Sequence, residues 1–195
     1  MTRTYVTNIT PLPAGVSREI AVAVLHDHQA MIQLNPLVTR YAAGAAPKAG
    51  LCTPEEAEKM TWYDITDEIN YLPGTRLAKG EVTYKGGFYN LPRGLQTHVF
   101  APAGVGINAK WSVEGSMPGE ERRPLELGVD APRDGLYLRE DVLLRCNMIL
   151  TGFVKKNLHK SHRVLCDNLK QRAASAIARR SAGPSAHLIV GESSH

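Results

Sequence analysis

The chain has 195 residues, of which 43% are hydrophobic and 22% are charged, with a formal net charge of +4 at pH 7. These values predict one soluble globular domain that is long enough to bury a sizeable core. No apolar run reaches the roughly 18 residues that a membrane-spanning helix needs, which excludes such a helix. The N-terminal sequence MTRTYVTNIT lacks the basic and apolar regions of a signal peptide, so we expect a cytoplasmic protein.

Basic residues gather near the C-terminus. From Val154 onward there are eight Lys or Arg and two acids, Asp167 and Glu192, whereas the rest of the chain carries 15 basic and 17 acidic residues. This distribution predicts a solvated helix face and a loose tail, and it is compatible with a weak contact at a membrane surface. No nucleic-acid-binding motif accompanies it, so we expect no nucleic-acid partner.

The three cysteines give no sign of a metal centre. Cys52, Cys146 and Cys166 are odd in number and far apart along the chain. They match neither a CxxC motif nor a zinc-binding spacing, and we interpret them as reduced thiols of a cytosolic protein. We therefore expect no metal site and no cofactor.

A strand, a helix and a second strand are expected first. Residues 4–10 form a β-like run, and Ser17 is suited to cap a helix that continues to about Leu34. Asn35-Pro36 stops or bends this helix, because the residue before a proline avoids the α conformation. Residues 37–43 follow as a strand, and the next loop contains at most one short helical turn.

Strands dominate the middle of the chain. The expected strands are 61–72, 80–90, 94–101, 104–115 and 136–146. The pair Gly86-Gly87 indicates a bulge or a bend in the second of them. A long connection rich in turn residues and charge separates the last two strands.

One long helix is expected over 149–178, followed by a disordered tail over 179–195. Consecutive strands joined by short turns form an antiparallel meander, whose apolar face must be covered by the two amphipathic helical segments. We therefore predict a single α+β domain over 1–178. In this domain a curved antiparallel sheet of about seven strands grips the long C-terminal helix around an internal hydrophobic cavity.

Four segments carry a resemblance to known proteins: HDHQAMIQLNPLV, YLPGTRLAKGEVTY, GLQTHVFAPAG and GLYLREDVLLRCNMILTGFVKKNLHKSH. They resemble the START-like helix-grip superfamily, also called the polyketide cyclase and lipid transport (SRPBCC) superfamily. Within it they are most similar to an uncharacterised family of small fungal proteins. The resemblance covers about residues 4–172 and supports the predicted fold.

The resemblance implies that a hydrophobic small molecule binds in the cavity, because superfamily members bind sterols, phospholipids, plant hormones or polyketides. Some members catalyse cyclisation, dehydration or condensation without a cofactor. We favour an enzyme of fungal secondary metabolism that cyclises or isomerises a terpenoid or polyketide intermediate, including a cycloaddition of Diels–Alder type. The alternative is a non-catalytic carrier of a lipid, a sterol or another small molecule. A monomer and a homodimer are both compatible with the sequence.

Two acidic residues interrupt the apolar faces of strands. Asp67 shares the face of 61–72 that carries Tyr63, and Glu140 interrupts the apolar face of 136–146. A buried carboxyl group must be paired, hydrogen-bonded or protonated. A protonated carboxyl group can donate a hydrogen bond to a substrate or act as a general acid and base. We therefore predict that Asp67, Tyr63 and Glu140 are catalytic.

Other interpretations of these acids stay open. A bulge would turn either acid to solvent, and a structural acid would cap a loop or pair with an arginine such as Arg139 or Arg145. Asp67 is the stronger candidate, because tyrosine hydroxyls share its face, whereas Glu140 lies in a charged run.

The expected lining of the cavity is mostly aromatic with a few polar groups, as in ligand pockets generally. The residues that we predict to contact the substrate are Tyr71, Tyr84, Phe88, His98, Trp111, Phe153 and His28. Ordinary core packing is the alternative for the aromatic residues, and a core or helix-end position is the alternative for His28. His98 could face either side of its strand.

Overall fold

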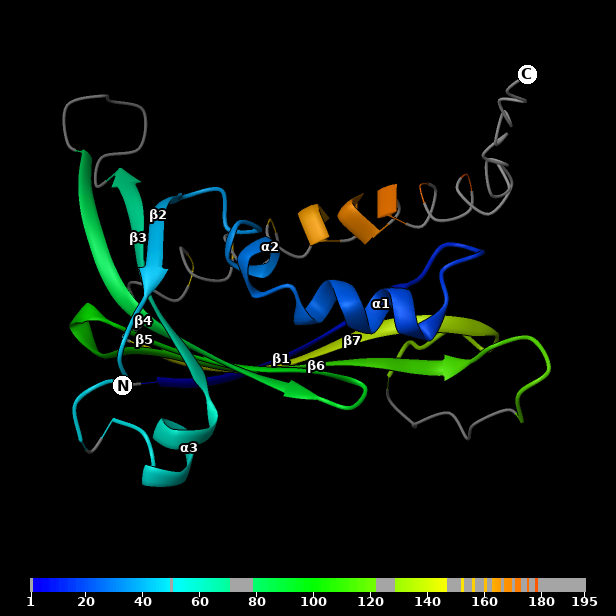
Figure 1. Cartoon of the computed structure of the whole chain (residues 1–195), viewed down its shortest axis with the longest axis horizontal. Helices are drawn as coiled ribbons and strands as arrows, with labels where there is room; N and C mark the ends of the chain where they lie inside the picture. The colour runs from blue at the N-terminus through cyan, green and yellow to red at the C-terminus, as the bar shows by residue number, and fades with distance from the viewer. Residues whose placement is uncertain are drawn as a thin grey trace, which may run out of the picture.

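The computed structural model describes residues 2–49, 51–70, 79–121 and 129–146, together with individual residues between 152 and 178. The elements of this part of the chain are shown in Figure 1. They are β1 (Thr2–Pro11), α1 (Arg18–His26), α2 (His28–Ile32), β2 (Val38–Ala43), α3 (Pro54–Lys59), β3 (Thr61–Asn70), β4 (Lys79–Leu91), β5 (Gly94–Ala101), the 3₁₀ turn η1 (Pro102–Gly104), β6 (Val105–Ser116) and β7 (Gly135–Cys146).

The seven strands form one antiparallel sheet in the order β1-β7-β6-β5-β4-β3-β2. Strands β2 to β7 follow one another as a meander, and β1 adds to the far edge beside β7. Helices α1 and α2 connect the two edge strands, so they must cross one face of the sheet. The sheet curves around them, with β3 and β4 rising past α2 (Figure 1). The predicted α+β architecture with a curved antiparallel meander is therefore confirmed.

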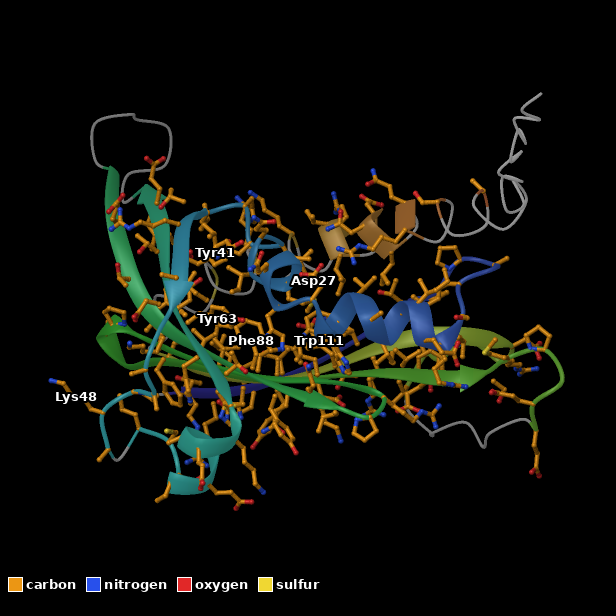
Figure 2. All side chains as sticks on the ribbon, in the orientation of Figure 1. Asp27, Tyr41, Lys48, Tyr63, Phe88 and Trp111 are labelled. Carbon is orange, nitrogen blue, oxygen red and sulfur yellow. The ribbon has the colours of Figure 1, made fainter. Side chains whose placement is uncertain are left out.

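The face that the helices cover carries the hydrophobic core. Every second residue of β7 from 136 to 146 is buried, which is the pattern of a strand with one covered face. Leu95 of β5 and Leu138 of β7 are fully enclosed in the same core as Leu25 of α1. Trp111 lies between the sheet and the helices in Figure 2. Each enclosed side chain of this size contributes about 1.5–3 kcal/mol through burial.

The C-terminal segment packs on the same core. Its described residues between 152 and 178 are helical and lie on the same side of the sheet as α1 (Figure 1). Leu165 and Leu169, four residues apart and therefore on one helix face, are enclosed in the core. They support the predicted amphipathic helix, while the other parts of 149–178 and the predicted tail 179–195 lie outside the described residues.

The first helical segment is two helices rather than one, which corrects the prediction of a helix from Ser17 to about Leu34. Ser17 caps α1 as predicted, because its hydroxyl accepts the backbone N–H of Ile20 at 3.3 Å. Asp27 then ends α1 and caps α2, accepting the N–H of Ala30 at 3.0 Å. Apolar residues keep helical spacing across this break, so the periodicity does not reveal it.

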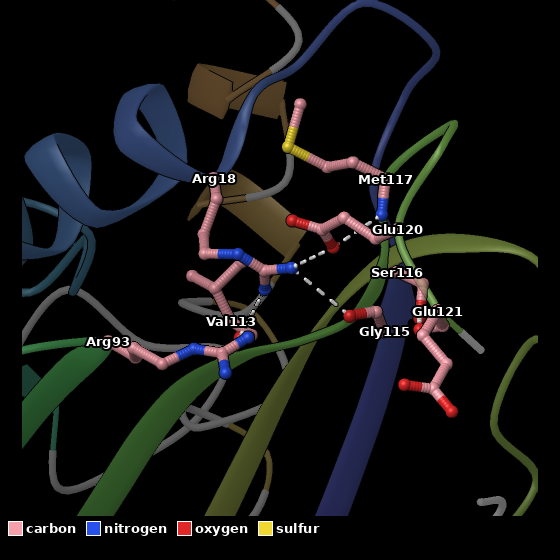
Figure 3. A network of polar contacts seen from close by, with 8 residues as sticks. All are labelled: Arg18, Arg93, Val113, Gly115, Ser116, Met117, Glu120 and Glu121. Atoms are coloured by element: carbon pink, nitrogen blue, oxygen red, sulfur yellow. Dashed lines mark hydrogen bonds and ion pairs between the residues drawn. The ribbon is translucent and has the colours of Figure 1, made fainter. Parts of the chain in front are cut away.

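Arg18 fastens the N-terminal end of α1 to the sheet. Its guanidinium donates to the carbonyl oxygens of Val113 and Gly115 at 3.2 Å each and forms an ion pair with Glu120 at 2.8 Å (Figure 3). Glu120 also accepts the backbone N–H of Met117 at 2.8 Å. The end of β6 and the chain that follows it are thus tied to the start of α1.

His26 fastens the other end of α1. Its Nε2 lies 3.0 Å from the carbonyl oxygen of Leu91 and 2.9 Å from that of Gly94. Both partners are acceptors, so Nε2 carries a hydrogen and donates to the β4–β5 turn. Gly94 is required there, because a Cβ would overlap the carbonyl oxygen of Trp111. Helix α1 is therefore held across the sheet at both ends.

The glycine pair in β4 does not form a bulge. The β3–β4 register continues without a shift through Tyr63–Gly86 and Trp62–Gly87. Strand β4 curves instead, which is the bend that we left open (Figure 1). The missing side chains also make room, because a Cβ on Gly86 would lie 2.7 Å from Cδ1 of Ile65, and one on Gly87 would lie 2.7 Å from the ring of Trp62.

Helix α3 covers the opposite face of the sheet at β3 (Figure 1). Thr53 and Glu56 form a capping box at its N-terminus. The indole N–H of Trp62 donates to the carbonyl oxygen of Ala57 at 3.1 Å, and the ring packs 6.1 Å from that of Phe100. A small second core therefore lies under α3. None of the helices in the described residues is long and apolar enough to cross a membrane.

Candidate functional site

The side chains of Asp67 and Glu140 both lie on the face of the sheet that the helices cover. The ladders β3–β4 and β6–β7 continue past them without a register shift, and the shift between Val38 and Arg40 lies in the neighbouring strand β2. Asp67 is 8% exposed and Glu140 is 1% exposed. A bulge therefore turns neither acid to solvent, while their catalytic role stays a prediction.

Asp67 receives hydrogen bonds from two different elements. Nδ2 of Asn35 donates to its Oδ2 at 2.7 Å, and the hydroxyl of Tyr84 donates to its Oδ1 at 3.0 Å. Oδ1 of Asn35 in turn accepts the backbone N–H of Leu37 at 3.1 Å. The acid thus ties the corner between α2 and β2 to strands β3 and β4. This is the loop-capping role that the sequence left open.

The environment of Asp67 also changes its proton affinity. Burial raises the pKa of Asp67, because desolvation disfavours the carboxylate, and the hydrogen bonds from Asn35 and Tyr84 oppose this in part. Burial and the nearby charge of Asp67 raise the pKa of the Tyr84 hydroxyl, so this phenol is a neutral donor at physiological pH. A carboxyl group next to a phenol can protonate a carbonyl oxygen or accept a proton from carbon.

A second polar group lies further along the same face, where α2 begins. Nδ1 of His28 lies 3.3 Å from the hydroxyl of Tyr63, and its Nε2 lies 2.9 Å from Oδ1 of Asn90. The ring of Phe88 packs 5.0 Å from His28 and 5.5 Å from Tyr63, edge to face in the second case. Burial, and to a smaller extent the neighbouring Tyr41, raise the pKa of Tyr63.

Glu140 lies in a different part of the covered face. It accepts a hydrogen bond from Nδ2 of Asn8 at 2.8 Å and is paired across the ladder with Trp111. Arg139, one of the arginines considered as its partner, forms an ion pair with Asp141 at 2.7 Å.

The two acids do not form a dyad. Strands β4, β5 and β6 separate Asp67 from Glu140, and adjacent strands are about 4.8 Å apart, which places the two acids roughly 19 Å apart along the sheet. A pair of carboxyl groups that share a proton must lie within hydrogen-bond distance. Each acid must therefore be considered with its own neighbours.

The predicted aromatic lining is partly brought together. Tyr84 and Phe88 lie beside Asp67 and Tyr63, respectively, and Trp111 lies under α1 (Figure 2). All three belong to or pack against the main core, so the core interpretation also holds for them. The predicted contacts Tyr71 and Phe153 lie outside the described residues.

His98 lies on the other face of the sheet, under α3, so it does not line the covered face as predicted. Its Nδ1 lies 3.2 Å from Glu56 of α3, and its Nε2 lies 3.0 Å from Nε2 of Gln96. The side chain of Gln96 donates, so Nδ1 carries the hydrogen and donates to Glu56. Burial lowers the pKa of His98, and the charge of Glu56 opposes this.

Sequence reasoning missed the amide partners of the site. Asn35, Asn90 and Asn8 each contact a residue that was predicted to be functional. Asn35 was noted only as the residue that breaks the helix before a proline, and no local pattern distinguishes the other two. Their contacts join segments more than 30 residues apart, which a single sequence does not relate.

A surface depression of about 330 Å³ lies beside α1, next to the β4–β5 turn that contains Pro92. The residues that line it are Arg18, Glu19, Val22, Ala23, His26 and Pro92. None of the predicted substrate contacts is among them, so we do not place the ligand there. Within the described residues, no group of three or more His, Cys, Asp or Glu side chains could hold a metal ion.

The chain belongs to the family described as "Domain of unknown function (DUF7053)", which matches residues 1–175. No curated protein matches the chain in sequence. The description of this family names no reaction, so the reaction is inferred from the geometry of the site.

Solved structures give the fold. The di-domain aromatase/cyclase StfQ from the steffimycin biosynthetic pathway is similar with a TM-score of 0.56 and 11% identity, over 88% of this chain and 52% of that one. This chain thus spans about half the length of StfQ. A START superfamily protein from Mycobacterium smegmatis has a TM-score of 0.51 and 14% identity, over 86% and 97% of the two chains. The Zhui aromatase/cyclase from Streptomyces sp. R1128 has a TM-score of 0.51 and 13% identity, over 93% and 99%. The START-like helix-grip fold expected from the sequence is confirmed.

Proposed function

We propose that this chain, a member of the DUF7053 family with a START-like fold, is an enzyme. It would bind a hydrophobic small molecule on the covered face of its sheet. The reaction is a cofactor-independent cyclisation or isomerisation of a polyketide or terpenoid intermediate. The aromatase/cyclase function named for StfQ and for Zhui supports this choice by analogy of fold. The ligand would occupy an internal cavity between the sheet and the helices.

One observation carries the proposal most directly. Asp67, a carboxyl group whose pKa is raised by burial, sits beside the hydroxyl of Tyr84 on a face that is mostly apolar and aromatic. The hydrogen bonds from Asn35 and Tyr84 offset the cost of burying this carboxyl group, and they also hold it in a fixed orientation. Placing a proton donor and acceptor within an apolar wall is how a ligand site fixes and polarises a carbonyl group.

The roles of the residues follow from their contacts. Asp67 exchanges a proton with the substrate, and Tyr84 holds its carboxyl group in place. The hydroxyl oxygen of Tyr63 contacts the substrate, and Phe88 and Trp111 provide apolar surface that holds the substrate in a reactive conformation. Orientation of this kind can lower a barrier by several kcal/mol. A Diels–Alder type cycloaddition would need only this orientation and one hydrogen bond to a carbonyl, so it belongs to the same proposal. Glu140 would act on a more distant part of a large substrate.

The test compares variants on a metabolite extract of the producing organism, followed by liquid chromatography and mass spectrometry. Wild-type protein should deplete one compound and produce an isomer of the same mass, or the dehydrated product of ring closure. Asp67→Asn and Tyr63→Phe should each slow this conversion tenfold or more, a change of about 1.4 kcal/mol in the barrier. Tyr5→Phe is the matched control, since it removes an exposed tyrosine hydroxyl from β1, which four strands separate from β3, and should leave the rate unchanged. Equal rates for all four proteins would remove Asp67 and Tyr63 from the mechanism.

A non-catalytic carrier is the second candidate, and a specific observation favours it. Lys156, Lys160 and Arg163 are exposed on the C-terminal helical segment at spacings of four and three residues, so they share one side of it. Basic residues near an anionic membrane contribute about 1 kcal/mol each to binding. A carrier should sediment with phosphatidylserine vesicles at low salt and dissociate at high salt, and Lys156→Glu with Lys160→Glu should abolish this binding. Absence of binding by the wild-type protein at low salt would argue against the carrier.

A further inference from the structure

His28, Tyr63 and Asn90, the polar residues that meet at the start of α2, form hydrogen bonds that determine which atoms carry a hydrogen. Nε2 of His28 lies 2.9 Å from Oδ1 of Asn90, and an amide oxygen can only accept. In a neutral imidazole Nε2 must therefore carry the hydrogen. Nδ1 is then left with a lone pair, and it lies 3.3 Å from the hydroxyl of Tyr63. The hydroxyl hydrogen of Tyr63 must point toward His28.

Packing keeps this arrangement in place. The ring of Phe88 lies 5.0 Å from that of His28 at an interplanar angle of 30°, and it meets Tyr63 edge to face at 5.5 Å. Gly86, which pairs with Tyr63 across the ladder, has no side chain, and a Cβ there would lie 3.3 Å from the ring of Phe88. The three rings are therefore in direct contact, and the imidazole is anchored on one side by Asn90.

We propose that His28 is a positioning residue that makes Tyr63 a proton relay for an enolisable ketone, with Asn90 fixing the imidazole in the Nε2–H form. This inference rests on the proposed function, and it assigns to His28 a role different from the direct substrate contact expected from the sequence. Tyr63 is the catalytic residue of the pair, because its hydroxyl oxygen is the atom that meets the substrate.

The proton transfers balance without a further reagent. Tyr63 passes its hydroxyl proton to Nδ1 of His28, and its oxygen takes a proton from the carbon next to the substrate carbonyl. That C–H bond breaks, its electron pair forms the enolate, and the O–H bond of Tyr63 is restored. The imidazolium keeps one extra proton, and its Nε2–H stays on Asn90. Return of that proton through Tyr63 to another carbon completes an isomerisation with no net gain of protons or electrons.

The first test reads the imidazole directly. In protein labelled with ¹⁵N-histidine, two-bond proton–nitrogen correlations at about pH 8, above the ordinary range for histidine titration, distinguish the two tautomers. The signal of His28, assigned from its loss in His28→Asn, should show a hydrogen on Nε2 and a bare Nδ1. Tyr63→Phe should shift the Nδ1 signal, whereas Tyr5→Phe, which removes an exposed hydroxyl of β1, should not. A hydrogen on Nδ1, or an Nδ1 signal that ignores Tyr63→Phe, would overturn the relay.

The second test measures the proton abstraction itself. Decalone, a bicyclic ketone, is incubated in D₂O, and exchange of the hydrogens next to its carbonyl is followed by NMR. Saturation-transfer NMR of the same sample shows whether the ketone is bound. Wild-type protein and Tyr5→Phe should accelerate exchange, and Tyr63→Phe and His28→Asn should lose the acceleration tenfold or more. A bound ketone that exchanges no faster than in buffer would refute the relay and leave ligand binding intact. A ketone that does not bind would count against the proposed function, and the nitrogen signals would still decide the arrangement of the relay.

Discussion

Replacement of Tyr84 by phenylalanine tests whether Asp67 is charged and held as described. The substitution removes only the hydroxyl that donates to Oδ1 of Asp67 at 3.0 Å. Loss of a hydrogen bond to a charged group costs about 1.5–3 kcal/mol, whereas loss of one between neutral groups costs about 0.5–1.5 kcal/mol. We therefore expect Tyr84→Phe to lower the free energy of unfolding by about 1.5–3 kcal/mol at neutral pH, measured by urea denaturation.

The pH dependence of this loss distinguishes the charged acid from a neutral one. Burial raises the folded-state pKa of Asp67 above its unfolded value, so the folded protein binds this proton more readily and gains stability relative to neutral pH as the pH falls through the raised pKa. Removing the hydroxyl takes away a group that opposes this rise, so the pKa of Asp67 rises further. On acidification, the stability loss caused by Tyr84→Phe should therefore shrink toward the value of about 0.5–1.5 kcal/mol expected for a hydrogen bond between neutral groups.

A matched variant separates this effect from the loss of any tyrosine hydroxyl. Tyr41 and Tyr84 both pair with Ile65, from opposite sides of β3. The hydroxyl of Tyr41 has a longer contact, 3.5 Å from Nε2 of Gln33. Tyr41→Phe should cost less and should show no pH dependence. The reasoning is refuted if the two variants lose the same stability, or if the loss in Tyr84→Phe is equal at neutral and acidic pH.

Two further predictions concern the frame around the site. Gly87→Ala should lower the free energy of unfolding by about 1–3 kcal/mol, because its Cβ would lie 2.7 Å from the ring of Trp62. The control is Gly106→Ala, whose Cβ would have no neighbour closer than 3.9 Å. Equal thermal shifts in the two variants would contradict the packing argument. Asp27→Asn should cost less than about 1 kcal/mol, since it removes only the partly exposed ion pair with Arg172, while Asp27→Ala should cost about 1 kcal/mol more by also removing the cap on α2. The Arg172 guanidinium and the N–H of Ala30 lower the pKa of Asp27. Its contribution to folding stability is therefore present above the ordinary carboxyl pKa and is lost as the pH falls through the lowered value. Equal effects of Asp27→Asn and Asp27→Ala in urea denaturation would contradict the capping role.

The fold could be predicted because its signals are local and repeated. Alternation along 136–146 indicates one covered face, and burial in β7 follows it residue by residue. The same alternation placed Asp67 and Glu140 inward, since a strand without a bulge leaves no other choice. The break at Asp27 could not be predicted, because the apolar spacing continues across it.

The site was harder to predict, for two physical reasons. The face of His98 could not be decided from the sequence, because both faces of β5 are covered, by α1 at Leu95 and by α3 at His98. Alternation then gives no sign of which face holds a ligand. The amide groups of Asn35 and Asn90 acquire their roles only when remote segments meet, and a lone asparagine in a sequence is most simply a turn or surface residue.

The most direct test of the central proposal is native mass spectrometry of the protein incubated with a metabolite extract of the producing organism. The compound released from the protein by denaturation is then compared with the extract before incubation. We predict a bound hydrophobic compound that is absent from the starting extract and is an isomer, or a dehydrated form, of a compound consumed from it. Release of an unchanged input compound after prolonged incubation would contradict the enzyme and favour the carrier, and a protein that binds no small molecule would contradict both.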